Sequence, residues 1–464
     1  MKARISKLSL ILIYPAIDFI VISFTIMFSY KFYRILEIGR YVYYGKAAII
    51  PYSFLAGLIT VIVMHFFGVY KRTSSLLNME EMKNAISGIS FGFLLLMFIM
   101  VFWQINLSRY VLIFSYIFSL FLVVIEKTFF YHVFPLANHM KGLHKKVVIY
   151  GAGELGKALY REIANSPKLG LIPVGFIDDD PNKDHLIYCQ SGFDSSKGIP
   201  VLGGAKDINK LREAIGFDEV YVAISDIDSA TLTNVLGKLK AENLKVSFVP
   251  NLYKFFIHKI KMQQIGHIPL IQEEEESSKP YLYVKRYVDL FLGVICFAVL
   301  WPLLLIIGLG IKMDSRGPVF FKHKRVGLNG KVFEMYKFRT MFTDVNPYAV
   351  NPLHTDDPRI TRLGKYLRKM SLDELPQIIN VLKRDMSFVG PRPEMPFIVA
   401  EYNEFHKERL KVKPGITGLW QLSGDRKKAI HENMDYDLYY IRNVSFFLDL
   451  AILLETLIFA FKGI

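Results

Sequence analysis

Cysteine is almost missing from this chain of 464 residues, which has only Cys189 and Cys296. The two lie far apart, and neither has a further Cys or His at metal-site spacing. Small domains held together by disulfides or zinc need such groups. We therefore expect no structural disulfide, no zinc site and a reducing compartment.

Charged residues are also scarce. They make up 21% of the chain against 52% hydrophobic residues, whereas soluble domains have about 25% and 45–50%. Acids are fewer than bases, 42 against 57, for a net charge of +15. A basic chain with an apolar excess faces anionic lipids, anionic substrates or nucleic acid. Because zinc-finger spacing, an RNP-type aromatic motif and a basic tail are all lacking, we expect no nucleic-acid partner.

The apolar excess is concentrated near the N-terminus. Each stretch approaches the ~20 residues that cross a bilayer, so we predict four transmembrane helices within residues 1–140. No small-residue cleavage site follows the first, which indicates a retained helix rather than a signal peptide. Asp18 and Glu126 lie inside these stretches, and they either face the bundle interior or reach water near a helix end. The stretches are residues 8–30, 47–69, 85–105 and 110–130.

An even number of crossings leaves both flanks of this region on one side of the membrane. Lysines and arginines before the first stretch and after the second and fourth favour the cytoplasm, although the first loop is basic as well. We expect a multi-pass membrane protein with its later domains on the cytoplasmic side.

From residue 145 the pattern changes to alternating strands and helices, which predicts a Rossmann-like parallel α/β domain over residues 145–270. The first strand leads into Gly151-Ala-Gly153-Glu-Leu-Gly156 and then a helix. Such glycines either let a phosphate approach the helix N-terminus or serve packing alone. In the first case Asp178, after the second strand, would hold a ribose hydroxyl. These four residues are the candidate nucleotide site.

Residues 271–280, rich in glutamate, read as an acidic linker before a new apolar segment at 281–312 that contains Pro302. Proline kinks a helix, and both flanks are basic. This pattern favours a re-entrant membrane helix; a straight crossing would separate the rest of the chain from the α/β domain. Lys285 and Arg286, at its start, either meet lipid phosphates or snorkel to the interface. We take them, with Pro302, as candidate lipid contacts.

Residues 313–464 predict a small, mainly helical domain that ends in an apolar helix at the membrane surface. Its chemistry centres on Ser371-Leu-Asp373-Glu374-Leu-Pro-Gln. A helical turn there, with Ser371 as its N-cap, would bury Leu372 and Leu375 and turn both acids into a cleft. The surroundings are basic, which suggests phosphate chemistry. One carboxylate can hold a divalent cation while the other attacks phosphorus.

Four segments in this order resemble the bacterial sugar transferase family: Lys337-Phe-Arg-Thr-Met, Ser371-Leu-Asp-Glu-Leu-Pro-Gln, Val389-Gly-Pro-Arg-Pro and Lys413-Pro-Gly-Ile-Thr-Gly-Leu-Trp-Gln. These are polyprenyl-phosphate hexose-1-phosphate transferases. The resemblance runs from about residue 283 to the C-terminus, where it is similar to the single-domain PglC form. The preceding helices and α/β domain are similar to the long WbaP/WcaJ type.

The resemblance implies an enzyme that transfers hexose-1-phosphate from a UDP-sugar to undecaprenyl phosphate and releases UMP. Asp373 would be the nucleophile that forms an aspartyl-phosphosugar intermediate, and Glu374 would bind Mg²⁺, or Mn²⁺ in its place. One departure is Trp301-Pro302, where the family often has Ser-Pro at the helix break. The implied partners are the UDP-hexose, undecaprenyl phosphate, membrane lipids and a second copy in a homodimer. Further phosphate- or substrate-binding residues would be Lys337, Arg339, Arg368, Arg392 and Asp437.

Three other functions compete with this hypothesis. A membrane-bound NAD-dependent nucleotide-sugar dehydratase would use the glycine loop, and Tyr281 with Lys285 matches its Tyr-x-x-x-Lys pair. That pair lies at the start of a membrane segment, and we do not expect NAD. A scaffold for polysaccharide assembly would leave Asp373 idle. A glycosyltransferase with a DxD motif would use Asp178-Asp-Asp180, which lies in the wrong domain.

Overall fold

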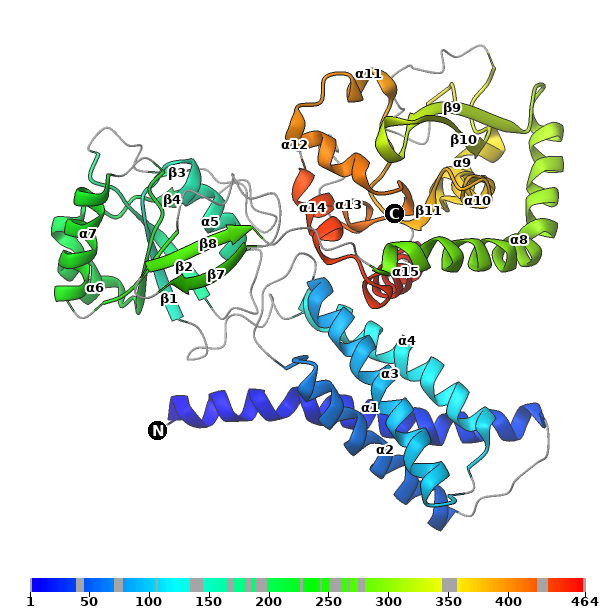
Figure 1. Cartoon of the computed structure of the whole chain (residues 1–464), viewed down its shortest axis with the longest axis horizontal. Helices are drawn as coiled ribbons and strands as arrows, with labels where there is room; N and C mark the ends of the chain where they lie inside the picture. Colours follow the sequence, from blue (N-terminus) through cyan, green and yellow to red (C-terminus); the bar gives the residue numbers. More distant parts are fainter. Residues whose placement is uncertain are drawn as a thin grey trace. The chain divides into compact units, whose positions relative to one another are not determined.

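We analysed a computed structural model, which divides into two compact units, Met1–Phe256 and Ile257–Ile464 (Figure 1). Each unit is described by itself. The structure describes residues 2–38, 46–70, 78–105, 107–133, 145–164, 171–180, 186–187, 198–225, 228–242, 244–249, 260–265, 268–273, 280–343, 357–423 and 433–461. Cys189 and the second half of the predicted acidic linker, residues 274–279, lie outside these ranges.

The first unit begins with four long helices. Within the described ranges they are apolar enough to cross a membrane, as is one later helix. This confirms a membrane protein with several apolar helices. The helices pack in the order α2 on α3, α1 on α2, α1 on α4 and α3 on α4. They are α1 (Lys2–Leu36), α2 (Lys46–Phe66), α3 (Met79–Phe102) and α4 (Arg109–Val133).

Small and polar residues line the contacts between these helices. A Cβ at Gly88 would come within 2.8 Å of the Met64 Cα, so glycine is what allows α2 and α3 to approach. Asp18 is fully buried and pairs with Lys127 Nζ at 2.9 Å, and Glu126 lies 3.2 Å from the same ammonium. A buried acid needs a counter-charge, and Lys127 supplies it. Asp18 therefore faces the interior between the packed helices and does not reach water.

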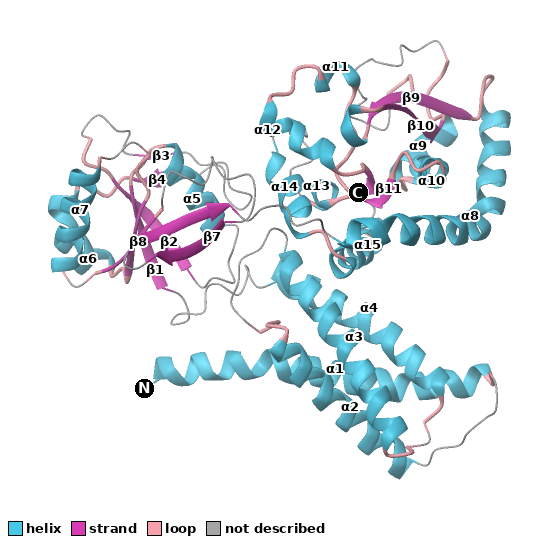
Figure 2. Cartoon of the chain, viewed as in Figure 1, coloured by secondary structure: helices cyan, strands magenta, loops and turns pink. Residues whose placement is uncertain are grey.

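The α/β part of the first unit is a four-stranded parallel sheet in the order β2-β1-β5-β6 (Figure 2). Successive side chains of a strand point to opposite faces. Val147 and Ile149 pack with α5, whereas Val148 and Tyr150 pack on the face that carries α6 and α7. The elements are β1 (Lys145–Tyr150), α5 (Glu154–Ala164), β2 (Leu171–Ile177), α6 (Ile208–Ile215), β5 (Glu219–Val222), α7 (Ser229–Ala241) and β6 (Lys245–Phe248).

Short elements complete this part. They are β3 (Leu186–Ile187) paired with β4 (Ile199–Pro200), and the 3-10 turn η4 (Ala205–Asp207) before α6. The second unit opens with an antiparallel hairpin of β7 (Ile260–Ile265) and β8 (Ile268–Glu273). Residues 271–273 of the predicted linker therefore belong to a strand, and Pro280 already starts the next helix, so the linker prediction was too long at both ends.

That helix is α8 (Pro280–Asp314), which contains Pro302. Figure 1 shows it as two limbs that meet at a sharp bend, as expected where proline removes a backbone hydrogen bond. Each limb packs against part of the domain that follows. Gly293 on the first limb contacts Leu382, and Ile307 and Ile311 on the second form a core with Phe338 and Leu367.

The domain after α8 is mainly helical, as predicted. Its strands form the antiparallel pair β9 and β10 and the short parallel pair β11 and β12. The elements are β9 (Phe320–Val326), η6 (Leu328–Gly330), β10 (Val332–Phe338), α9 (Arg362–Lys369), η7 (Leu372–Gln377), α10 (Ile378–Leu382), β11 (Ser387–Val389), α11 (Pro396–Val399), α12 (Glu404–Lys407), η8 (Glu408–Lys411), β12 (Gly415–Thr417), α13 (Leu419–Leu422), α14 (Met434–Asn443) and α15 (Phe446–Phe461).

Candidate active site

The two adjacent acids lie on η7. Leu372 and Leu375 pack into the apolar core with α8, as predicted, and this turns Asp373 and Glu374 away from that core. Ser371 does not act as the predicted N-cap. It adopts a left-handed conformation with φ 52° and its side chain makes no capping hydrogen bond, so the acidic turn is positioned by its leucines and by neighbouring elements instead.

Glu374 is held by two cations from different elements. Its Oε1 accepts a hydrogen bond from Lys337 Nζ on β10 at 2.7 Å and from Arg392 Nη2 at 3.0 Å. Burial alone would raise the pKa of Glu374, but Arg392 and Lys337 together hold it well below its ordinary value. Glu374 is thus a permanent anion, and both cations use one of its oxygens.

Asp373 has different surroundings although it is the next residue. Within the described ranges it takes part in no ion pair, while Lys337 and Arg368 act on it only through their charge. Burial raises the pKa of Asp373, and the charge of Glu374 adds to that effect. A carboxylate that is raised in pKa and not clamped is a stronger nucleophile than a paired one. The structure therefore separates two neighbouring acids into an anchored one and an unclamped one.

Asn380 aligns the acidic turn with β10, and the sequence analysis did not single it out. It is fully buried, accepts from the Tyr336 amide at 2.9 Å and donates to the Glu334 carbonyl at 2.6 Å. These bonds fix α10, and with it η7, against the strand that carries Lys337. A single amide inside the apolar run Ile378-Ile-Asn-Val-Leu382 is the signal that could have found it.

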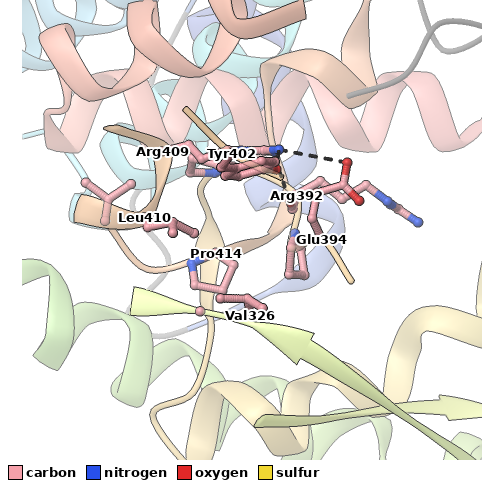
Figure 3. A pocket seen from close by; sticks show the side chains of 11 residues that line it. Val326, Arg392, Glu394, Tyr402, Arg409, Leu410 and Pro414 are labelled. Carbon is pink, nitrogen blue, oxygen red and sulfur yellow. Dashed lines mark hydrogen bonds and ion pairs between the residues drawn. The ribbon is translucent and has the colours of Figure 1, made fainter. Parts of the chain in front are cut away.

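Arg392 stands in a rigid loop beside a second buried cluster. Asp437 is 3% exposed on α14 and lies 2.8 Å from Arg409, which also donates to Tyr402 and to the Arg392 carbonyl. Figure 3 shows Arg392, Tyr402 and Arg409 around a pocket that Glu394, Val326 and Pro414 also line. Burial raises the pKa of Asp437 to about 6 despite the nearby Arg409. Asp437 therefore forms its ion pair with Arg409, which bonds to the backbone of Arg392, and not with Asp373 or Glu374.

Arg339 is not brought to the acids. It is 5% exposed and donates to the Arg316 and Ser315 carbonyls at 2.6 and 2.8 Å. These carbonyls follow the C-terminus of α8, where unsatisfied backbone oxygens need donors. A Cβ at Gly317, with φ +130°, would clash with the same guanidinium. Its hydrogen bonds therefore close the end of α8 and give the predicted phosphate contact of Arg339 no support.

Lys285 has a different environment from the one expected of a lipid contact. It is 7% exposed and pairs with Asp449 on α15, which also accepts from Tyr281 at 2.7 Å and from Tyr440 at 2.8 Å. The prediction that Lys285 meets lipid phosphates or snorkels is wrong, because its ammonium is enclosed by this network. Tyr281 and Lys285 both donate hydrogen bonds to Asp449. Arg286 is exposed, as a lipid contact requires.

The apolar C-terminal helix, α15, also differs from its prediction. Its Leu448, Ala451 and Ile452 are fully buried and Glu455 is 5% exposed. The buried acids and apolar residues pack against the domain, so α15 is part of its core rather than a helix lying only along a membrane surface.

The glycine loop of the α/β part is built for close packing. A Cβ at Gly156 would come within 1.9 Å of the Gly151 carbonyl, and Gly151 has φ +111°. A Cβ at Gly153 would meet nothing within 4 Å. Asp178 Oδ2 accepts from the Ala152 amide at 2.8 Å, which is one of the loop amides that a bound phosphate would use. The chain's own carboxylate thus occupies part of the candidate nucleotide site.

A divalent cation fits the acidic turn in one respect. Lys337 and Arg392 both bond to Oε1, so the Oε2 of Glu374 has no hydrogen-bond partner among the described residues, and Asp373 is unclamped beside it. Mg²⁺ is commonly held by one or two carboxylates together with substrate phosphates. Within the described ranges no group of three or more His, Cys, Asp or Glu side chains gathers that could hold a metal ion.

Residues 280–463 match the family model described as bacterial sugar transferase, and residues 65–250 match one described as CoA-binding domain. An Escherichia coli K12 protein named UDP-glucose:undecaprenyl-phosphate glucose-1-phosphate transferase is 32% identical over 339 residues, 71% of this chain and 69% of the relative.

Two further relatives differ in length. A Salmonella typhimurium protein named undecaprenyl-phosphate galactose phosphotransferase is 29% identical over 76% of this chain and 75% of its own length. The Sinorhizobium fredii exopolysaccharide production protein ExoY is 38% identical over 37% of this chain and 83% of its own length. This chain spans only about two thirds of some long relatives, 66% for one from Xanthomonas campestris. On this similarity, and on the C-terminal match that contains the acidic turn, the chain belongs to the bacterial sugar transferase family, in its long WbaP/WcaJ form.

Proposed function

We propose that this protein is a phosphotransferase that moves hexose-1-phosphate from a UDP-sugar to undecaprenyl phosphate and releases UMP. The observation that carries the proposal is that the two neighbouring acids differ in their partners. Glu374 is clamped by Lys337 and Arg392, whereas Asp373 beside it is not. Two relatives support the proposal by their names: one is called a UDP-glucose:undecaprenyl-phosphate glucose-1-phosphate transferase and the other an undecaprenyl-phosphate galactose phosphotransferase.

The first step uses Asp373 as nucleophile. One of its carboxylate oxygens attacks the phosphorus that bears the sugar, a P–O bond to the bridging oxygen breaks, and UMP leaves with that oxygen. Lys337 and Arg392 lie where charge accumulates on the phosphates, and guanidinium groups bind phosphate in a bidentate manner. In the second step a phosphate oxygen of the lipid attacks the same phosphorus, and the Asp373 carboxylate is released.

A divalent cation would assist these steps. Glu374, through its Oε2, is the residue that would hold Mg²⁺, or Mn²⁺, together with the diphosphate of the donor. The ion would supply charge neutralisation for the leaving UMP. Arg368, whose charge acts on Asp373, would bind the second phosphate.

The bend of α8 suits a lipid substrate. The carrier presents its phosphate at headgroup depth, so a helix that enters and leaves the same leaflet would hold the acidic turn there. In this arrangement Pro302 makes the bend and Arg286 meets lipid phosphates. The protein would then lie in the bacterial inner membrane with its catalytic domain on the cytoplasmic side. The reaction would be the first membrane step of exopolysaccharide, capsule or O-antigen synthesis.

The test is the identity of the nucleotide product. Purified protein in detergent is supplied with undecaprenyl phosphate and each of a panel of UDP-sugars, with glucose and galactose first and N-acetylated sugars next. UMP is expected with at least one of them. Release of UDP as the sole product would show sugar transfer without its phosphate and overturn the proposal.

The intermediate is tested without the acceptor. When UDP-sugar alone is supplied, intact-protein mass spectrometry should show the added mass of one hexose phosphate on the wild type and none on Asp373→Asn. Glu374→Gln should still fold and should react slowly. Near wild-type turnover in Asp373→Asn would rule out Asp373 as the nucleophile. Absence of UMP release by the wild type with every UDP-sugar would favour a scaffold, and retention of NAD by the purified protein would favour a dehydratase.

A further inference from the structure

Arg409 combines burial with an unusual set of partners. Its side chain is 2% exposed, and it is enclosed by two carboxylates, Asp437 at 2.8 Å and Glu394 at 3.9 Å. It also donates to the Tyr402 hydroxyl at 2.7 Å. A buried guanidinium is costly unless it is paired and hydrogen-bonded, and here both conditions are met. The remaining contact is to the backbone of Arg392.

Each backbone carbonyl of residues 391–394, the loop that carries Arg392, accepts a hydrogen bond. The Pro391 carbonyl accepts from the Gly415 amide at 2.9 Å, and the Glu394 carbonyl accepts from the Val326 amide at 2.9 Å. The two carbonyls between them accept from arginine side chains: Arg392 from Arg409 Nη2 at 2.9 Å and Pro393 from Arg325 Nη1 at 3.2 Å. Four consecutive carbonyls thus have a donor, and the prolines at 391 and 393 restrict the backbone further.

This arrangement links a buried cluster to the reacting groups. The backbone of Arg392 is fixed by Arg409, while its side chain lies 3.0 Å from Glu374. We propose that Arg409, neutralised by Asp437 and Glu394, is a positioning residue that aims the Arg392 guanidinium at the acidic turn and at the donor phosphates. It touches none of the reacting atoms itself. The inference rests on the proposed function and gives Asp437 an indirect part in it.

Lysine at position 409 would keep the positive charge, so Asp437 and Glu394 would retain a partner. It has no fork of donors, however, and cannot bond to Asp437, Tyr402 and the Arg392 carbonyl in the same geometry. The arrangement therefore predicts that Arg409→Lys lowers kcat for UMP release by about tenfold to a hundredfold, the loss that small misplacements of a catalytic group cause.

The deciding experiment is a double-mutant cycle with UDP-glucose and undecaprenyl phosphate as substrates, or with the UDP-sugar that releases most UMP. Arg392→Lys removes the guanidinium that Arg409 is proposed to aim. In that background Arg409→Lys should cost less than about twofold, because residues that act as one unit are not additive. The same large loss in both backgrounds, together with a lowered melting temperature, would mean a merely structural role and overturn the proposal.

A matched control and a milder variant complete the design. Lys407 lies two positions away and makes an exposed ion pair with Glu404, so Lys407→Gln should leave kcat unchanged. If Arg409→Lys does not fold, Tyr402→Phe removes one bond of Arg409 and should lower kcat a few-fold, again only when Arg392 is present. Additive behaviour of Tyr402→Phe would overturn the proposal equally.

Hydrogen exchange measures the positioning without turnover. The amides of Val326 and Gly415, which bond to the ends of the loop, should exchange faster in Arg409→Lys, while Met335 in the β9–β10 ladder should not change. If the wild type releases no UMP, the proposed function fails and exchange alone decides on the loop. Unchanged exchange at Val326 and Gly415 would overturn the positioning role in either case.

Discussion

Two neighbouring carboxyl groups on one turn acquire different chemistry from their surroundings. Glu374 is depressed in pKa because Arg392 and Lys337 share its Oε1, whereas burial raises the pKa of Asp373. Separate environments for adjacent acids are how one site obtains both an electrostatic anchor and a nucleophile. At this scale the assignment of roles depends on which oxygen meets which cation, a fact of packing rather than of residue type.

The pKa of Asp437, raised to about 6 by burial, predicts an acid limb in activity. As the pH falls through about 6, Asp437 takes up a proton and Arg409 loses its 2.8 Å counter-charge. UMP release by the wild type should therefore decline with a midpoint near that pH. In Asp437→Asn activity should be lower and should lack this limb between about pH 5 and 7; kcat against pH for both proteins is the measurement.

Acid unfolding is not the cause of this limb. A carboxyl whose pKa in the folded state lies above its ordinary value of 3.8 binds its proton more tightly in the folded state. Its contribution to stability is therefore fully present below about pH 4 and is lost as the pH rises through about 6. A melting temperature that falls between pH 7 and 5 in step with activity, or an unaltered limb in Asp437→Asn, would contradict the prediction.

At the scale of elements, α8 is the support of the catalytic domain. Its first limb is tied to α15 through Lys285 and Asp449, and Asp289 on the same limb accepts from the Ser387 hydroxyl of β11 at 2.8 Å. Its second limb forms an apolar core with Leu372 and Leu375 of η7. A change in the position of α8 would therefore move the acidic turn with it.

Asp449→Asn is expected to destabilise the protein far more than Tyr281→Phe. The first leaves the buried Lys285 short of a counter-charge, a loss of about 3–5 kcal/mol for a broken buried pair. The second removes one hydrogen bond of 2.7 Å, which contributes about 1 kcal/mol. Melting temperatures in detergent measure both, with the exposed Asp435→Asn on α14 as control. Equal shifts for Asp449→Asn and Tyr281→Phe would refute an ionic lock.

The glycine turn after β1 predicts a graded series of substitutions. Gly156→Val should prevent folding of the α/β part, because even its Cβ would lie 1.9 Å from the Gly151 carbonyl. Gly153→Ala should be tolerated, since no atom lies within 4 Å of that Cβ. Limited proteolysis of each variant distinguishes them. A folded Gly156→Val, or an unfolded Gly153→Ala, would show that the packing requirement has been assigned to the wrong glycine.

At the scale of the whole molecule, the family match at residues 280–463 lies within the second unit, Ile257–Ile464. The relative ExoY is covered over 83% of its length by 189 aligned residues, so a family member can consist of little more than such a segment. The four long helices and the parallel sheet belong to the first unit, whereas Lys337 and Arg392, which bond to Glu374, belong to the second.

A chain that begins at residue 257 should therefore release UMP from the same UDP-sugar at a rate of the same order as the full chain. Domains with their own core fold alone, and both limbs of α8 are inside this piece. The measurement is UMP release in detergent, with Asp373→Asn in the shortened chain as the background. A folded but inactive piece would show that the first unit contributes to catalysis.

Much of the local structure could be predicted from the sequence. Apolar runs of the length of a bilayer, the strand that precedes Gly151 and the helical spacing of Leu372 and Leu375 are all local patterns, and each is confirmed. The errors concern side chains whose partners are distant in sequence. Lys285 bonds to Asp449, 164 residues away, and Arg339 turns to the carbonyls of Ser315 and Arg316. Ser371 does not cap η7, since it adopts a left-handed conformation and its side chain makes no capping hydrogen bond.

Periodicity and adjacency are properties of short stretches of chain. The sequence was therefore sufficient to predict that apolar helices precede an α/β part and that Asp373 and Glu374 are neighbours on a turn. Only the tertiary structure decided that Lys337 and Arg392 both clamp Glu374, that Arg409 stands behind Arg392, and that Lys285 is an internal ion. The reason is physical. The charge state and direction of a buried polar group are set by whichever atoms surround it, and those atoms come from segments that only folding brings together.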